Sequence, residues 1–197
     1  MAHPGFLNDA AITGVILAGG LGRRMGGVDK GLQLLDGKAM VRHVAERLAP
    51  QVGQLLINAN RSQNEYGALG YPVIGDLIPN FAGPLAGLHA ALSVATTPLV
   101  VTAPCDSPYI PEDLVTRLHQ ALLASDAPLA VATADGRLHP VFCLCQTTLL
   151  PALTHYLESG GRKLAQWCDE MGAVEVDFSD QAYAFRNFNT LADLTSK

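Results

Sequence analysis

The chain has few charged residues and no basic excess, and this excludes several classes of protein. Charged residues make up 16% of the 197 residues, and the formal net charge is −5. A global positive surface that would recruit nucleic acid is therefore not expected. The sequence also lacks an apolar run near the roughly 20 residues that a membrane span needs, and residues 1–10 show neither a basic start nor an apolar stretch. We therefore expect a cytoplasmic protein without a signal peptide and without nucleic-acid or membrane partners.

Cysteine is sparse as well. The chain has four cysteines and no Cys-x-x-Cys pair, so a metal or redox motif of that kind is not expected. Buried, reduced thiols are the expected state of these residues. Hydrophobic residues, in contrast, make up 49% of the chain, which suits a sheet that is covered on both faces. We expect a single domain over residues 1–197.

Short apolar runs alternate with amphipathic segments along the chain. Strands are expected at 12–18, 54–58, 73–74 and 98–103, and helices at 38–48, 84–94 and 111–123. This βαβ alternation predicts a Rossmann-like three-layer α/β sandwich with a mostly parallel sheet. Asp135-Gly136 separates two further strands, 129–133 and 139–145, and predicts a reversal of the chain. The C-terminal part of the sheet is therefore expected to be mixed or antiparallel.

A glycine-rich loop follows the first strand. Five glycines and three cations lie in this segment: Gly19, Gly20, Gly22, Gly26, Gly27, Arg23, Arg24 and Lys30. Free backbone N–H groups beside cations form a site for a polyphosphate. A Walker loop is excluded because Gly31 follows Lys30 where Ser or Thr is required. A dinucleotide fingerprint fails because Met25 takes the place of its third glycine.

Polar residues follow the next strands as well. Asn58, Asp76 and Asp106 each stand at or just past a strand end, and the carboxyl ends of parallel strands meet at one edge of a sheet, where ligands bind. Asp106 is the candidate ligand for Mg²⁺, which takes one or two carboxylates and completes its shell with water and substrate phosphates. A turn or cap role is the alternative for such an aspartate.

Two pairs of residues have a spacing that suggests a shared face. Gly83 and Gly87 lie one helical turn apart, so either a ligand approaches the helix there or another element packs tightly against it. Asn187 and Asn189 face the same side if the chain is extended. We interpret the two asparagines as ligands of a second substrate.

The glycine-rich loop carries a family resemblance. Leu17-Ala-Gly-Gly-x-Gly-x-Arg-Met-Gly26 resembles the signature of nucleotidyltransferases that take an NTP and release pyrophosphate. The version with Arg23-Arg24-Met25-Gly26-Gly27 and Asp29-Lys30-Gly31 is similar to the molybdenum cofactor guanylyltransferase family. The resemblance spans residues 13–194 and includes the segments 57–61, 83–87, 105–111, 139–140, 176–180 and 187–190.

This resemblance implies an activity and a set of site residues. The expected reaction transfers GMP from GTP to the terminal phosphate of molybdenum-molybdopterin, with Mg²⁺ at Asp106 and Mn²⁺ as a substitute. Arg24, Lys30 and Asp106 are the expected catalytic residues. GTP is expected in the N-terminal half, on Leu17, Ala18, Gly19, Gly20, Lys30, Asn58, Asp76, Gly83, Gly87 and Asp106. The acceptor is expected in the C-terminal part, on Arg162, Lys163, Asn187 and Asn189.

One residue departs from the family pattern. Family members can show Arg-Arg where Arg162-Lys163 stand in this chain. A lysine there would hold an acceptor phosphate as a point charge rather than through a bidentate fork. Transient contacts with other cofactor-assembly proteins and with molybdoenzymes are also implied.

Other functions remain open at this point. A cytidylyltransferase or a sugar-phosphate nucleotidyltransferase would share the loop and differ in base and acceptor. A non-catalytic nucleotide-binding protein would bind GTP without turnover.

Overall fold

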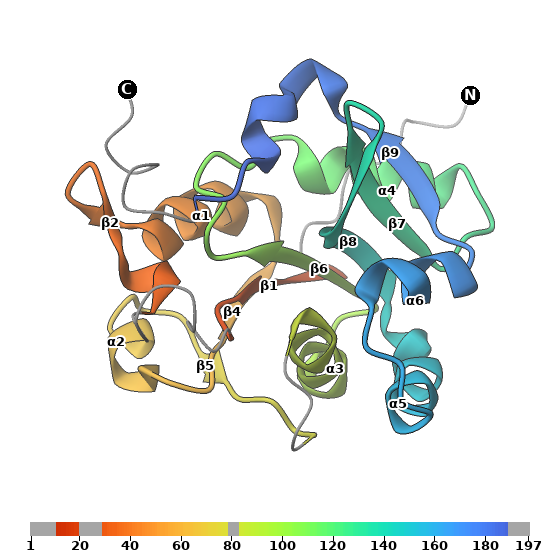
Figure 1. The fold of residues 1–197 in the computed structure, drawn as a ribbon, viewed down its shortest axis with the longest axis horizontal. Helices are drawn as coiled ribbons and strands as arrows, with labels where there is room; N and C mark the ends of the chain where they lie inside the picture. The colour runs from red at the N-terminus through yellow and green to blue at the C-terminus, as the bar shows by residue number, and fades with distance from the viewer. Residues whose placement is uncertain (1–10, 20–28, 79–82, 189–197) are drawn as a thin grey trace.

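The computed structural model describes residues 11–19, 29–78 and 83–188 of the chain. Within these residues a seven-stranded sheet has the order β5-β4-β1-β6-β8-β7-β9 (Figure 1). Its strands are β1 (Ile12–Leu17), β4 (Gln54–Asn58), β5 (Val73–Ile74), β6 (Leu99–Pro104), β7 (Leu129–Ala134), β8 (Arg137–Gln146) and β9 (Val174–Asp177). β1 pairs in parallel with both β4 and β6, whereas β8 is antiparallel to β6 and β7. The prediction of a mostly parallel sheet with an antiparallel C-terminal part is confirmed.

Helices cover both faces of the sheet (Figure 1). The helices α1 (Met40–Leu48) and α4 (Leu114–Leu123) contribute Val44 and Leu118 to one apolar core. On the other face, α3 (Pro84–Val94), α5 (Leu150–Glu158) and α6 (Leu164–Glu170) contribute Leu88, Leu153 and Trp167 to a second core. Because all six residues of β1 are buried, its near-continuous apolar run is that of a strand covered on both sides. The three-layer prediction is confirmed.

Two of the predicted helices begin later than expected. Lys38–Ala39 form a strand, β3, which pairs with β2 (Leu34–Leu35) in a small hairpin. Asp36 and Gly37 at its turn both have positive φ, 49° and 77°, as tight two-residue turns require. Helix α1 therefore begins at Met40. Helix α4 begins at Leu114 instead of 111.

The hairpin between β7 and β8 has the reversal that the Asp-Gly pair predicts. Asp135 and Gly136 have φ values of 50° and 71°, and β7 and β8 pair from Ala134 with Arg137 onwards. Since β8 runs against β6, the first residues of β8 arrive at the same edge of the sheet as the last residues of β6.

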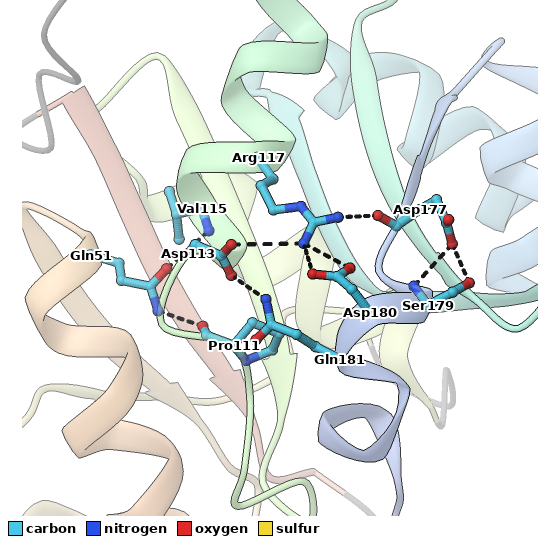
Figure 2. Close-up of polar contacts among 9 residues, drawn as sticks. All are labelled: Gln51, Pro111, Asp113, Val115, Arg117, Asp177, Ser179, Asp180 and Gln181. Carbon is cyan, nitrogen blue, oxygen red and sulfur yellow. Dashed lines mark hydrogen bonds and ion pairs between the residues drawn. The ribbon is translucent and has the colours of Figure 1, made fainter.

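A late segment, η6 (Ser179–Phe185), is tied to helix α4 by a polar network (Figure 2). Arg117 Nη1 donates to both carboxylate oxygens of Asp180 at 3.0 Å, and Arg117 Nη2 donates to the carbonyl of Asp177. Gln181 Nε2 donates to Asp113 Oδ1 at 3.0 Å. The guanidinium of Arg117 also lies 4.1 Å from the ring centroid of Phe178, in the range of a cation–π contact. These contacts fix the position of η6.

The four cysteines are free and buried, as expected from the sequence. No helix in the described part of the chain is both long and apolar enough to cross a membrane.

Candidate active site

The candidate site lies where the strand order reverses, between β1 and β6. From β1 the chain proceeds to β4 on one side, whereas β6 pairs with the other side of β1. Open α/β sheets bind ligands in the crevice at such a point, outside the carboxyl ends of the strands. Backbone hydrogen bonds join the carboxyl end of β1 to those of its two neighbours. Cys105 N, just after β6, donates to Leu17 O at 3.1 Å, and Ala18 N donates to Asn58 O, at the end of β4, at 2.8 Å.

Lys30 and Asp106 meet at this edge. Lys30 Nζ lies 3.5 Å from Asp106 Oδ2, and the side chains are 28% and 13% exposed, respectively. Burial raises the pKa of Asp106, while the nearby ammonium of Lys30 opposes that rise. The ammonium of Lys30 is suited to neutralise phosphate charge, and the partly desolvated carboxylate of Asp106 is suited to hold a metal ion.

A buried tyrosine fixes the residue that precedes Lys30. Tyr66, on helix α2 (Gln63–Gly67), is fully buried, and its hydroxyl donates to Asp29 Oδ1. Gly31 packs so closely that a Cβ there would lie 2.5 Å from Tyr66 Oη and 3.2 Å from Cys105 Sγ. Burial and the Asp29 carboxylate raise the pKa of Tyr66 beyond its ordinary value. Asp29 and Gly31, the two residues on either side of Lys30, are thus fixed in position by Tyr66 and Cys105.

Sequence reasoning missed Tyr66. The contact joins residues 37 positions apart, and a single tyrosine in a weak helix gives no pattern that would indicate it.

Polar side chains also gather on the other side of β1, at the same carboxyl end of the sheet, where Leu17 lies opposite both Asn58 and Pro104. Asn58 Nδ2 donates to Asp76 Oδ1 at 3.0 Å, and Asn60 Nδ2 donates to Asp76 Oδ2 at 2.7 Å. Asp76 N donates in return to Asn60 Oδ1 at 2.8 Å. This network fixes Asn58 beside Gly19, where a Cβ would lie 3.3 Å from Asn58 Oδ1. Asn60 is a further site residue that was not predicted, although it stands two positions after Asn58.

Helix α3 packs directly against this group. A Cβ at Gly87 would lie 2.4 Å from Asn58 Oδ1 and 2.8 Å from Leu17 Cδ2, so glycine is required for the helix to approach. Gly83, just before α3, has a φ of 125°, a value that L-residues rarely adopt. Gly87 thus allows α3 to pack on Asn58, whereas a Cβ at Gly83 would meet nothing within 4 Å. The role of both glycines in GTP binding stays a prediction.

The C-terminal segment contacts the loop that carries Asp106. Ser107 Oγ donates to Asn187 Oδ1 at 3.0 Å, and Phe188 N donates to Asp106 O at 3.0 Å. Asn187 therefore stands beside the metal candidate. Its predicted partner Asn189 lies outside the described residues, as do Gly20 and Arg24 of the glycine-rich loop.

Arg162 and Lys163 lie in the connection between α5 and α6. Arg162 Nη1 donates to the carbonyls of Leu157 and Gly161 at 2.9 and 2.6 Å, which satisfies backbone groups at the end of α5. Tyr156 Oη donates to the carbonyl of Lys163 at 3.1 Å. Their expected role in acceptor binding stays a prediction.

The residues at this edge suit a magnesium ion that is shared with a substrate. No group of three or more His, Cys, Asp or Glu side chains that could form a metal cage occurs within residues 11–19, 29–78 and 83–188. The partly buried Asp106 carboxylate provides one oxygen-donor group, and Mg²⁺ usually takes one or two carboxylates with phosphates and waters. The donor set therefore fits Mg²⁺ or Mn²⁺ bound together with a nucleotide.

The chain resembles known proteins along most of its length. Residues 14–173 match the family model described as MobA-like NTP transferase domain. The chain is 51% identical to molybdenum cofactor guanylyltransferase from Ralstonia nicotianae, over 93% of this chain and 94% of the relative. It is 45% identical to the protein of the same name from Haemophilus influenzae, over 93% of this chain and 95% of the relative.

Solved structures share the fold. Molybdopterin-guanine dinucleotide biosynthesis protein A from Archaeoglobus fulgidus superposes with a TM-score of 0.75 at 24% identity, over 92% of this chain and 94% of that one. A 4-diphosphocytidyl-2C-methyl-D-erythritol synthase from Anaerococcus prevotii has a TM-score of 0.72 at 12% identity, over 95% and 94%. The identity of the relatives and the extent of the family match show that the chain is a nucleotidyltransferase and belongs to the molybdenum cofactor guanylyltransferase family.

Proposed function

We propose that Lys30 and Asp106 perform the transfer of GMP from GTP to the terminal phosphate of a molybdopterin-type acceptor. The observation that carries this assignment is the Lys30–Asp106 pair, 3.5 Å apart, at the point where the strand order reverses. A cation and a carboxylate at that place are positioned for a triphosphate and its divalent ion.

The nucleotide lies on the β1 side of this pair. Leu17, Ala18 and Gly19, at the carboxyl end of β1, are the proposed nucleotide residues of this strand, and Gly20 and Arg24, which follow in the sequence, are proposed to join them. Asn58 and Asp76 hold each other in a fixed orientation through the 3.0 Å hydrogen bond. GTP is the expected nucleotide.

The chemistry requires positioning and charge neutralisation rather than a base. A phosphate monoester is largely dianionic near neutral pH, so an oxygen of the acceptor phosphate attacks the α-phosphorus of GTP without prior deprotonation. The bond from the α-phosphorus to the bridging oxygen breaks, and pyrophosphate leaves with both bonding electrons. Lys30 stabilises the negative charge that gathers on the phosphoryl oxygens. Asp106 holds Mg²⁺, or Mn²⁺ in its place, which supplies further charge neutralisation when bound.

The acceptor lies on the C-terminal side, where Asn187 stands next to the Asp106 loop. Asn189, Arg162 and Lys163 are the other proposed acceptor ligands. We also propose transient contacts with cofactor-assembly proteins and molybdoenzymes, and we expect the enzyme to act in the cytoplasm.

The test is pyrophosphate release with each of the four NTPs, with molybdopterin or a sugar phosphate as acceptor and with Mg²⁺. Turnover is expected with GTP and molybdopterin. Preference for CTP, or for a sugar phosphate, would indicate a different nucleotidyltransferase. Tight GTP binding without turnover on any acceptor would indicate a non-catalytic nucleotide-binding protein.

Lys30→Ala tests the mechanism itself. The variant is expected to lose about 10²–10³-fold in kcat, the usual cost of removing one charge-stabilising group, with its thermal midpoint little changed. Lys38→Ala is the matched control, because Lys38 pairs with Glu46 on the surface at 2.7 Å. Near-normal turnover in Lys30→Ala would remove this lysine from the mechanism.

A further inference from the structure

Asn60 lies at the carboxyl edge of the sheet, just past the end of β4. The preceding residue is fixed by its backbone, because Ala59 N donates to Ile74 O at 2.8 Å. This hydrogen bond continues the pairing of β4 with β5, in which Asn58 lies opposite Ile74. The pairing of the two strands thus brings Asn60 beside Asp76, which follows β5.

Asn60 and Asp76 form a reciprocal pair. Asn60 Nδ2 donates to Asp76 Oδ2 at 2.7 Å, and Asp76 N donates to Asn60 Oδ1 at 2.8 Å. The other carboxylate oxygen, Asp76 Oδ1, accepts from Asn58 Nδ2 at 3.0 Å. The terminal torsion of an aspartate has a broad energy minimum, so a donor on one oxygen alone leaves the carboxylate able to rotate. Asn60 supplies the second donor, and with it the orientation of the carboxylate is fixed.

The two asparagines differ in how deeply they are embedded. Asn58 is 2% exposed and is confined by α3, because a Cβ at Gly87 would lie 2.4 Å from its Oδ1. Asn60, in contrast, is exposed. A change at Asn58 therefore disturbs the packing of α3, whereas a change at Asn60 acts on the orientation of Asp76 without removing a part of the core.

The carboxylate of Asp76 is not paired with a cation in the described part of the chain. Within residues 11–19, 29–78 and 83–188, its side-chain donors are two neutral amides, and none of the ion pairs there includes Asp76. Such a carboxylate repels a triphosphate, and it only accepts hydrogen bonds. The part of a nucleotide that suits Asp76 is therefore neutral and carries hydrogen-bond donors.

The strand order places Asp76 far from the reacting centre. Asp76 follows β5 and Asp106 follows β6, and β4 and β1 lie between these two strands. Since neighbouring strands are about 4.8 Å apart, the ends of β5 and β6 are separated by roughly 14 Å. A nucleotide whose phosphates lie at Lys30 and Asp106 therefore reaches Asp76 with its base, the end remote from the phosphates.

Guanine matches this carboxylate among the four bases. Its N1–H and its N2 amino group are adjacent donors on one edge, whereas adenine, cytosine and uracil each place an acceptor beside the donor of that edge. A carboxylate has about four lone-pair sites, so both oxygens of Asp76 can accept from guanine while they also accept from the two asparagines.

We infer that Asn60 is the positioning residue that sets base specificity, because it orients the Asp76 carboxylate toward N1–H and the N2 amino group of guanine. Asn60 acts through Asp76 and does not itself contact the base. The inference rests on the proposed transfer reaction, in which Asp76 belongs to the nucleotide side.

Kinetics with GTP and ITP test the inference, because ITP lacks the N2 amino group. The wild type is expected to prefer GTP about 10-fold or more in kcat/KM, since ITP leaves a charged acceptor unpaired. Asn60→Ala should reduce this preference to less than about 3-fold and raise KM for GTP, while kcat at saturating GTP stays within about 2-fold. A role in folding alone would affect both nucleotides alike. An unchanged preference in Asn60→Ala would overturn the inference.

Two further variants separate the hydrogen bonds of Asn60. Asn60→Asp keeps an oxygen that accepts from Asp76 N but removes the donor to Asp76 Oδ2, so it should lose the preference for GTP as Asn60→Ala does. Gln63→Ala is the matched control, because Gln63 Nε2 donates to Ala59 O at 3.0 Å rather than to Asp76. This control should keep the wild-type preference. Retention of the preference by Asn60→Asp, or its loss in Gln63→Ala, would contradict the role of Asn60.

Direct binding separates this inference from the proposed reaction. Equilibrium dialysis of GTP, ITP and 2′-deoxy-GTP against the full chain with Mg²⁺ requires no acceptor. The wild type is expected to bind GTP more tightly than ITP, and Asn60→Ala to lose that difference. If Asn60→Ala instead loses a preference for GTP over 2′-deoxy-GTP, Asp76 binds the ribose and the inference is wrong. A preference for GTP that depends on Asn60, without transfer to any acceptor, would uphold the inference and refute the reaction.

Discussion

Gly87→Ala adds a single methyl group at the most crowded point of the nucleotide side. The new Cβ would lie 2.4 Å from Asn58 Oδ1, 2.8 Å from Leu17 Cδ2 and 3.1 Å from Asn58 Cγ. Asn58 Oδ1 has to retreat to at least about 3.0 Å, the limit for real Cβ contacts. Since Asn58 also donates to Asp76 at 3.0 Å, its displacement disturbs both residues that we assign to GTP.

The expected effect on stability is small, while the effect on activity is large. Alanine in a helix is favoured over glycine by about 1 kcal/mol, and overpacking costs about 1–3 kcal/mol. The net loss in the free energy of unfolding is therefore about 0–2 kcal/mol. Asn58 Oδ1 must move by about 0.6 Å, the difference between 2.4 and 3.0 Å. Because misplacement of a substrate-binding group by about 1 Å costs on the order of 10²-fold in rate, kcat/KM for GTP should fall by at least about one order of magnitude.

The assay is coupled pyrophosphate release, with urea denaturation of the same preparations. Gly67→Ala, at the end of helix α2, is the matched control, because its nearest neighbour to a new Cβ, Val73 Cγ2, is 4.0 Å away. That variant should keep full activity. If Gly87→Ala retains the kcat/KM of the wild type, the position of Asn58 does not depend on α3, and our account of this contact is wrong.

Two further variants test the other side of the site. Tyr66→Phe removes the hydroxyl that donates to Asp29 and should lower kcat about 10-fold; in a Lys30→Ala background it should have no added effect, whereas an additive loss would assign Tyr66 to general stability. Asp106→Asn should abolish turnover and raise the free energy of unfolding at pH 7. The gain in stability is expected because burial raises the pKa of Asp106 in the folded protein, which means that the ionised carboxylate opposes folding. The free energy of unfolding of the wild type therefore falls as the pH rises from the ordinary aspartate pKa to the raised one. Urea titrations from pH 3 to 8 should show this fall in the wild type and its loss in the variant; parallel curves would contradict it.

The sequence was sufficient for the sheet and for the edge at which the polar residues meet. Apolar runs of strand length identify β1, β4 and β6, and the rule for parallel strands places Asn58, Asp76 and Asp106 at one edge. The Asp135-Gly136 pair predicts the reversal before β8 because its turn requires two positive φ values. The catalytic and binding roles of these residues stay predictions.

Contacts between residues far apart in the chain could not be predicted from the sequence. The Tyr66–Asp29 hydrogen bond spans 37 positions, and the Arg117–Asp180 pair spans 63. Neither has a periodic pattern, because each depends on where two elements come to lie after the chain has packed. The β2–β3 hairpin was missed for a local reason: Lys38 and Ala39 fit the start of an amphipathic helix as well as a two-residue strand.

The reversed direction of β8 has a consequence for how such enzymes diversify. The proposed nucleotide residues Asn58, Asp76 and Asp106 follow forward-running strands, whereas the β7–β8 hairpin reaches the same edge of the sheet through a strand that runs in the opposite direction. A substitution or insertion in that hairpin can therefore reshape one side of the edge without any change in the loops that carry Lys30 and Asp106.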